Sequence, residues 1–290
     1  MNEAKKHAGR SQSNGEQLLV GDGVELCVET FGDAADPAIL LIHGASASMI
    51  WWETDLCRMI ADGGRFVIRY DNRDTGLSTS YPTGNPGYAL SDMASDAIRI
   101  LDWLEVRSAH IVGRSLGAAI ALAIAIDHPK RALSITFVSA TTGDDDLPAM
   151  TSEFEEATSK IPDFSNLAAL ENHIVEVLRI FSGNSPHFDE VEMRSLSALD
   201  IARTRNMQST LANHFLIDFD APRNGELSDL SIPALIVHGE NDPVFPLPHG
   251  RALSDAVPGS RLLVLPDTGH DIPRQHWEIF VTALTDHTKI

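Results

Sequence analysis

A serine between two glycines is the clearest candidate for chemistry in this chain. Residues 113–117 read Gly-Arg-Ser-Leu-Gly, with an apolar run on either side. This pattern predicts a tight turn from a strand into a helix, which would expose the Ser115 hydroxyl and direct helix N–H groups toward an anion beside it. The residue would then be a nucleophile; the alternative is a turn whose serine only caps the helix.

A serine hydroxyl is a poor nucleophile at neutral pH, so a base and an orienting acid should follow along the chain. Asp242 comes after the apolar run 234–238, and His270 comes after the run 261–265 in a loop that contains glycine. The chain order serine, aspartate, histidine is the one expected when all three converge above the carboxyl edge of a parallel sheet. Asp144, just beyond an earlier predicted strand, is a second candidate for the acid.

His43-Gly44-Ala45 follows another predicted strand and supplies the fourth element. A tetrahedral intermediate needs hydrogen-bond donors directed at its oxyanion, and backbone N–H groups can serve. We expect those of Ala45 and Leu116 to form this oxyanion hole. For His43 itself, we favour a ring that braces the loop over one that touches substrate.

Short β-rich runs alternate with longer helical patterns, which is typical of a parallel α/β sheet covered by helices. The expected strands are residues 25–31, 38–42, 66–70, 109–112, 134–138, 234–238 and 261–265. The expected helices are 49–62, 88–104, 115–127, 246–256 and 272–285. The sheet therefore places the three candidate residues at the ends of strands.

The alternation stops between two parts of the core, 18–142 and 231–290, and the intervening residues 143–230 are expected to form a helical cap. Apolar residues recur there at helical spacing from Leu167 to Phe181, and 17 acidic residues stand against 6 basic ones. The acidic side chains are most simply a solvated outer face. Residues 1–17 are expected to be a disordered polar tail. The candidates for substrate-binding residues are Trp51, Trp52, Met150, Phe154, Leu178, Phe181 and Phe215.

Composition disfavours several classes of protein, among them nucleic-acid-binding and membrane-spanning ones. The chain has 290 residues and a net charge of -19, which disfavours nucleic acid as a partner. Its longest apolar run has ten residues, about half of a membrane span, and no signal peptide is recognised at the start. Cys27 and Cys57 fit no disulfide framework or zinc pattern. We expect a cytoplasmic protein without metal or cofactor; the sequence does not indicate its oligomeric state.

In these ordered motifs the chain resembles α/β-hydrolase fold enzymes from about Val20 to its end. Residues 69–78, Arg-Tyr-Asp-Asn-Arg-Asp-Thr-Gly-Leu-Ser, are similar to the family's Asp-x-Arg-Gly-x-Gly-x-Ser loop, in the form seen in carboxylesterases like aclacinomycin methylesterase. The resemblance implies a mostly parallel eight-stranded sheet flanked by helices, with the cap inserted after the sixth strand. Arg114 departs from the family, whose members more often carry a neutral or aromatic residue there. It would either bind an acidic substrate group or pair with an acid of the protein.

These observations predict a serine esterase that cleaves a medium-sized apolar carboxylic ester, such as a methyl ester or a lactone. The apolar candidates for the pocket suit rings and short acyl chains, and the acidic cap disfavours polyanionic substrates. Two alternatives stay open: a carbon-carbon bond hydrolase with the same three residues, and a small-molecule sensor with weak hydrolase activity. Covalent labelling of Ser115 followed by turnover assays would separate them.

Overall fold

A computed structural model describes residues 13–289 of the chain. An eight-stranded sheet forms its centre, in the order β1-β2-β4-β3-β5-β6-β7-β8. Pairs β1/β2 and β2/β4 are antiparallel, and all the other pairs are parallel. The strands are β1 (Gln17–Gly21), β2 (Val24–Phe31), β3 (Ala38–Ile42), β4 (Phe66–Tyr70), β5 (Ala109–Arg114), β6 (Ala132–Val138), β7 (Ala234–Gly239) and β8 (Arg261–Leu265). The predicted mostly parallel eight-stranded α/β fold is confirmed.

The start of the chain differs from the prediction. Residues 1–12 of the expected tail lie outside the described residues, but Gln17 begins strand β1 and Ser13 forms a bridge with Phe31. Asn14 also donates its backbone N–H to the Thr30 carbonyl at 2.9 Å. The polar composition concealed this pairing because β1 buries only Leu19 and leaves its other side chains exposed or half-buried.

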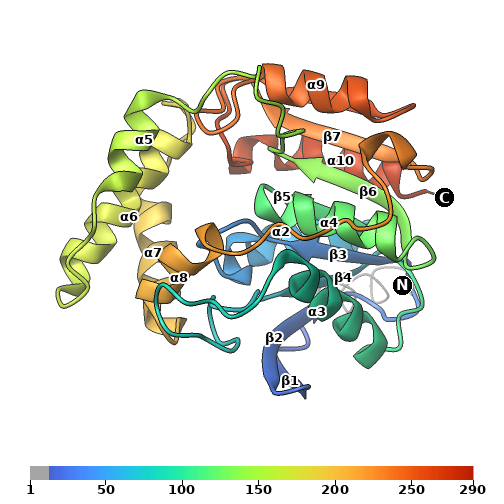
Figure 1. Cartoon of the computed structure of the whole chain (residues 1–290), viewed down its shortest axis with the longest axis horizontal. Helices are drawn as coiled ribbons and strands as arrows, with labels where there is room; N and C mark the ends of the chain where they lie inside the picture. The colour runs from blue at the N-terminus through green and yellow to red at the C-terminus, as the bar shows by residue number, and fades with distance from the viewer. Residues whose placement is uncertain (1–12, 290) are drawn as a thin grey trace, which may run out of the picture.

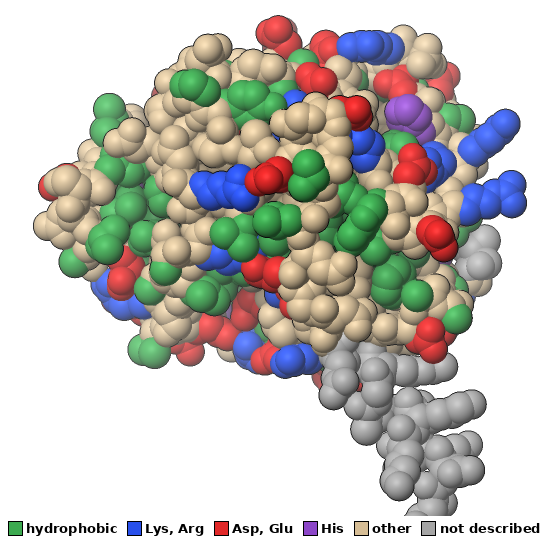
Figure 2. Space-filling model, turned by 90° about the horizontal axis from the view of Figure 1, so that it is seen from below, with side chains coloured by type: hydrophobic (Ala, Val, Ile, Leu, Met, Phe, Trp, Pro, Cys, Tyr) green, Lys and Arg blue, Asp and Glu red, His purple; other side chains and the backbone are tan. Residues whose placement is uncertain are grey.

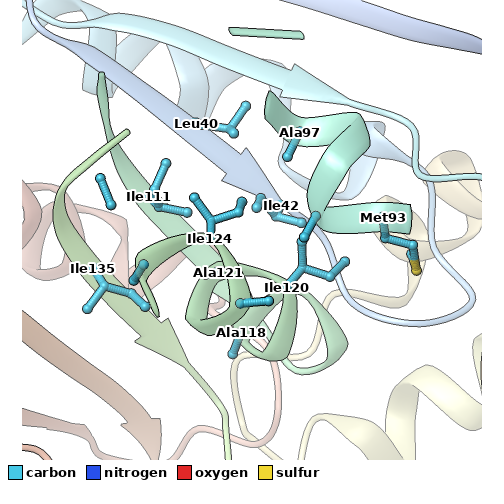
Figure 3. Close-up of a cluster of buried hydrophobic side chains, with 14 of the residues drawn as sticks. Leu40, Ile42, Met93, Ala97, Ile111, Ala118, Ile120, Ala121, Ile124 and Ile135 are labelled. Atoms are coloured by element: carbon cyan, nitrogen blue, oxygen red, sulfur yellow. The ribbon is translucent and has the colours of Figure 1, made fainter. Parts of the chain in front are cut away.

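Helices cover both faces of the sheet. One buried apolar cluster joins the sheet to α3 (Leu90–Trp103), α4 (Leu116–Asp127) and α9 (Pro248–Ala256). The second cluster joins it to α2 (Thr54–Asp62) and α10 (Trp277–His287). In Figure 3, Ile120 and Ile124 of α4 lie among side chains of the strands and of α3. This packing fixes the position of α4, which begins directly after Ser115.

Two of the expected helices have a 3-10 turn near their start. The range 49–62 divides into a short 3-10 turn, η1 (Met49–Trp51), and α2, because Trp52 has a non-helical ψ of 84°. In the range 272–285, Pro273 is itself extended, with φ -66° and ψ 153°, and η4 (Arg274–His276) precedes α10. Both breaks lie near the carboxyl edge of the sheet, where the candidate residues are.

The segment between β6 and β7, which we call the helical insertion, contains no strand among its residues 139–233. It forms α5 (Ser152–Ser159), α6 (Leu167–Phe181), α7 (Glu190–Arg203) and α8 (Met207–Ala212), followed by η2 (Asn213–Phe215) and η3 (Leu227–Asp229). Figure 1 shows α5 to α8 gathered at one end of the sheet. The apolar repeat from Leu167 to Phe181 coincides with α6.

The surface mixes charges of both signs. On the face shown in Figure 2, acidic and basic side chains are interspersed with hydrophobic ones. Within the described part of the chain, no helix combines the length and hydropathy needed to cross a bilayer.

Candidate active site

Ser115 occupies a sharp turn between β5 and α4. Its backbone has φ 51° and ψ -120°, a region that costs free energy for any residue with a side chain. The neighbouring glycines are required by space: a Cβ at Gly113 would lie 2.1 Å from the Gly117 carbonyl oxygen, and one at Gly117 would lie 2.3 Å from that of Ile42. The Gly-x-Ser-x-Gly pattern therefore encodes the strained turn, and the start of α4 at Leu116 places helix N–H groups beside the serine.

His270 and Asp242 are hydrogen-bonded to each other. The His270 Nδ1 lies 2.9 Å from Asp242 Oδ1 and 2.8 Å from Oδ2. The carboxylate also accepts the backbone N–H groups of Val244 and Phe245, both at 2.9 Å. Burial alone would raise the pKa of Asp242, but the neighbouring His270 and these hydrogen bonds lower it below its usual value. Asp242 is thus held as an anion that fixes the imidazole.

The two loops that carry this pair touch through their backbones. A Cβ at Gly239 would lie 1.9 Å from the Gly269 carbonyl oxygen. Beyond that contact, the N–H of Glu240 binds the Leu265 carbonyl at 2.9 Å, and the N–H of Asn241 binds that of Thr268 at 2.8 Å. These hydrogen bonds extend the β7/β8 pairing and bring the loops of Asp242 and His270 together.

Asp144, the second candidate for the acid, has a different position. It is exposed, and its Oδ2 accepts the hydroxyl of Thr142 at 2.7 Å. The structure pairs His270 with Asp242 instead.

The helical insertion contacts His270 through Phe181. The Phe181 carbonyl accepts the His270 backbone N–H at 2.9 Å, and the two rings meet edge to face with their centres 4.6 Å apart.

The loop after β3 passes directly over the serine. A Cβ at Gly44 would lie 3.0 Å from Ser115 Cβ, so the backbone that leads to Ala45 faces the nucleophile at close range. Ser46 has a left-handed φ of 60°, and its N–H donates to His214 Nδ1 of the helical insertion at 3.3 Å. Ala45 follows this close approach and Leu116 follows Ser115 in the chain. That their N–H groups form the oxyanion hole stays a prediction.

His43 is buried beside Arg114. Its Nε2 lies 3.2 Å from Arg114 Nη1, and its ring packs edge-on against Trp52. Burial, followed by the charge of Arg114, lowers the pKa of His43 well below its usual value, so the ring is neutral. This geometry fits the bracing role expected for His43. Arg114 has an acidic partner, since its Nη1 lies 2.7 Å from Asp271 Oδ1.

The loop 69–78, which carried the family resemblance, supports the region after β3. Asp71 accepts the backbone N–H of Met49 at 2.8 Å and that of Leu77 at 2.9 Å. A Cβ at Gly76 would lie 2.3 Å from Asp71 Oδ2, so glycine is needed there. From α7, Arg203 forms an ion pair with Asp71 at 2.7 Å. The motif thus joins the core to the helical insertion.

A cavity of about 570 Å³ lies between the helical insertion and this edge of the core. Its lining is mostly apolar and includes Ala45, together with Arg114 and Asp271. Ser115 and His270, which adjoin these last two in the chain, are not themselves among the lining residues. Five of the seven predicted substrate-binding residues line it: Trp51, Phe154, Leu178, Phe181 and Phe215.

Two predicted substrate-binding residues do not line this cavity. Trp52 is 2% exposed and stacks on Phe280 in the core. Met150 is 43% exposed and lies in the loop before α5. For both residues the prediction used residue type and position in the chain, neither of which determines the side-chain direction.

Sequence reasoning missed Asp200, which lines the cavity from α7. This buried carboxylate accepts the Ser48 hydroxyl at 2.5 Å and the Trp51 indole N–H at 2.7 Å, and burial raises its pKa. Its partners lie about 150 residues away in sequence, and no local pattern connects them. An acidic residue on a helix that also carries Glu190, Glu192, Arg194 and Arg203 gave no signal of its burial.

Comparisons with known proteins agree with this fold and geometry. The model of the family described as alpha/beta hydrolase fold matches residues 37–276. The rhodomycin D methylesterases DauP, from Streptomyces sp. (strain C5), and DnrP, from Streptomyces peucetius, are each 30% identical to 94% of this chain, over 98% of their own length. A meta-cleavage product hydrolase, CumD from Pseudomonas fluorescens IP01, matches with a TM-score of 0.75 and 21% identity, over 93% of this chain and 96% of its own.

These matches also confirm the resemblance to methylesterases that the loop 69–78 indicated. The CumD structure, at its lower sequence identity, supports the fold. The chain belongs to the alpha/beta hydrolase fold family.

Proposed function

We propose that the protein is a serine hydrolase that cleaves a medium-sized, largely apolar carboxylic ester through an acyl-enzyme on Ser115. The observation that carries the proposal is the His270–Asp242 pair, in the loops beside a strained serine at the start of α4. The methylesterase names of DauP and DnrP favour a methyl ester among the possible esters.

Each residue has a role in the proposed reaction. His270 takes the proton of Ser115 as the oxygen attacks the ester carbonyl carbon, and Asp242 stabilises the imidazolium. The N–H groups of Ala45 and Leu116 bind the oxyanion. His270 then gives the proton to the departing alcohol, which leaves the acyl group on Ser115. A water molecule, deprotonated by His270, then attacks the acyl carbon. The bond from that carbon to Ser115 Oγ breaks, His270 returns the proton to Oγ, and the carboxylic acid leaves.

The proposed substrate class follows from the cavity. Trp51, Phe154 and Phe181 offer flat apolar surfaces, which suit a ring system or a short acyl chain. The volume of about 570 Å³ is within the range of small-molecule sites. Residues 143–230 contain 17 acidic and 6 basic residues. This negative charge disfavours polyanionic substrates such as acyl coenzyme A. We therefore propose that the helical insertion acts as the cap that selects a neutral apolar ester.

The test is a panel of kcat/KM values for nitrophenyl esters, aromatic methyl esters, lactones, acyl coenzyme A thioesters and a vinylogous diketone. We expect the highest value for an aromatic methyl ester or a lactone. A preference for thioesters, or cleavage of the diketone's carbon-carbon bond, would overturn the ester assignment. Fluorophosphonate labelling of Ser115 with negligible turnover of the whole panel would indicate a sensor.

A further inference from the structure

The residue before the nucleophile reaches two other loops of the site. The Arg114 side chain is 5% exposed, and its Nη1 lies 2.7 Å from Asp271 Oδ1 and 3.2 Å from His43 Nε2. Its guanidinium carbon also lies 5.5 Å from the centre of the Phe181 ring in α6. A single buried cation thus contacts side chains from the loop after β3, the loop after β8 and the helical insertion.

Two of these contacts, Asp271 and His43, are next to groups with a role in the proposed reaction. Arg114 precedes Ser115, Asp271 follows His270, and His43 precedes the Gly44-Ala45 backbone that faces the serine. We propose that Arg114 is a positioning residue that holds the His270 loop and the oxyanion loop in register with Ser115, and that its charge balance with Asp271 sets the pH range of activity. This inference rests on the proposed function of Ser115 and His270.

The contacts favour positioning over recognition of an anionic substrate. Arg114 lines the cavity, but Asp271 matches its charge at close range. His43, which is kept neutral, offers Nε2 as an acceptor for the Arg114 N–H, and this requires the His43 proton on Nδ1. A guanidinium is suited to join two acceptors in this way because its donors have fixed directions.

The charge balance gives two opposite expectations. His270 is bonded to Asp242, is followed by Asp271, and interacts through charge with His43 and His238. Asp271 is paired with Arg114 and also lies near Glu53, whose pKa is raised to about 7 by burial and then by the charges of Glu192 and Asp271. Removing only Arg114 leaves the Asp271 carboxylate without its partner. The negative charge then favours the charged form of the His270 imidazole, which cannot act as a base. Removing only the carboxylate leaves the cation unmatched and favours the neutral, active form.

The experiment compares Arg114→Met, Asp271→Asn and the double variant, with kcat/KM for an activated ester measured from pH 5 to 9. We expect each single variant to lose roughly 10- to 100-fold in kcat/KM, because small displacements of catalytic groups have effects of that order. The acid limb should move up by about 0.5 to 1 pH unit in Arg114→Met and down by a similar amount in Asp271→Asn. In the double variant it should return to the wild-type position while the rate stays low.

Two controls separate charge from shape. Arg114→Lys keeps the charge but loses the planar fork, so it should lose rate with an unchanged pH profile. Arg131→Met removes a cation paired with Asp102 at 2.8 Å, near the amino end of β6 and away from the site, and should change neither rate nor profile. If Arg114→Met does not fold, Asp271→Asn and Arg114→Lys still test the inference.

An acid limb that stays in place in both single variants, or that moves the same way in both, would overturn the proposal. The rate of Ser115 labelling by a fluorophosphonate provides a second readout, since it needs no ester turnover. Wild-type protein that is labelled but turns over no ester would refute the esterase function and leave the positioning role measurable by labelling. Opposite shifts in the labelling profile would then support that role.

Discussion

Replacing Gly239 with alanine should separate the loops that carry Asp242 and His270. A Cβ at this position would lie 1.9 Å from the Gly269 carbonyl oxygen and 2.4 Å from that of Thr268. Ordinary contact begins near 3.4 Å, and both obstacles are backbone atoms, so the loops must move apart by about 1 Å or more.

A displacement of about 1 Å in a catalytic group can cost roughly 100-fold in rate, and we expect kcat/KM of Gly239→Ala to fall by that order. Overpacking of a buried contact costs about 1 to 3 kcal/mol, which in a chain of this size lowers Tm by roughly 2 to 10 °C. The assay is ester hydrolysis under kcat/KM conditions, together with thermal unfolding followed by circular dichroism.

Gly21→Ala is the matched control. A Cβ there meets only Arg99 Nη1 at 3.5 Å, an ordinary contact, and the residue lies in β1. This variant should keep wild-type activity and stability. If Gly239→Ala also retains wild-type kcat/KM and Tm, the reasoning that backbone contact positions the two loops is refuted.

Three further predictions follow from individual side chains. Asp242→Asn should lower kcat by about 10⁴-fold because it disturbs the histidine's orientation and charge, whereas the exposed Asp144→Asn should be silent; a reversal in the same esterase assay would reassign the acid. Burial lowers the pKa of His110 to about 4, so the unfolded chain binds protons that the folded one rejects, and Tm should fall between about pH 6.5 and 4; a slope that does not flatten in His110→Asn would contradict this. Asp200→Asn places an amide against the Trp51 indole N–H and should raise KM several-fold and cost about 1 to 3 kcal/mol of stability, measured by steady-state kinetics and urea unfolding; an unchanged variant would mean that the contact is dispensable.

The sheet and the turn at Ser115 could be predicted because their signals are local. Continuous apolar runs mark strands that are buried on both faces. Gly113 and Gly117 mark a turn that has no room for a Cβ at those two positions. The positions of Asp242 and His270 could be predicted because the loops that follow parallel strands lie at the same edge of the sheet. Their closeness at this edge allows the hydrogen bond between them.

The walls of the cavity could not be predicted in the same way. Trp51 and Trp52 are adjacent and identical in type, yet only Trp51 lines the cavity, because successive residues of a turn point in different directions. Asp200 reaches Ser48 and Trp51 only through the packing of α7 on the core. Such contacts depend on tertiary geometry, which a single sequence does not encode locally.

The central claim, that Ser115 carries the acyl group, is tested most directly by a rapid-quench experiment with a nitrophenyl ester. The account predicts a burst of about one nitrophenolate per protein molecule and, after digestion and mass spectrometry, an acyl group on the peptide that contains Ser115. Ser115→Ala should show neither. Steady ester turnover in Ser115→Ala, or an acyl group found on another residue of the wild-type protein, would contradict the account.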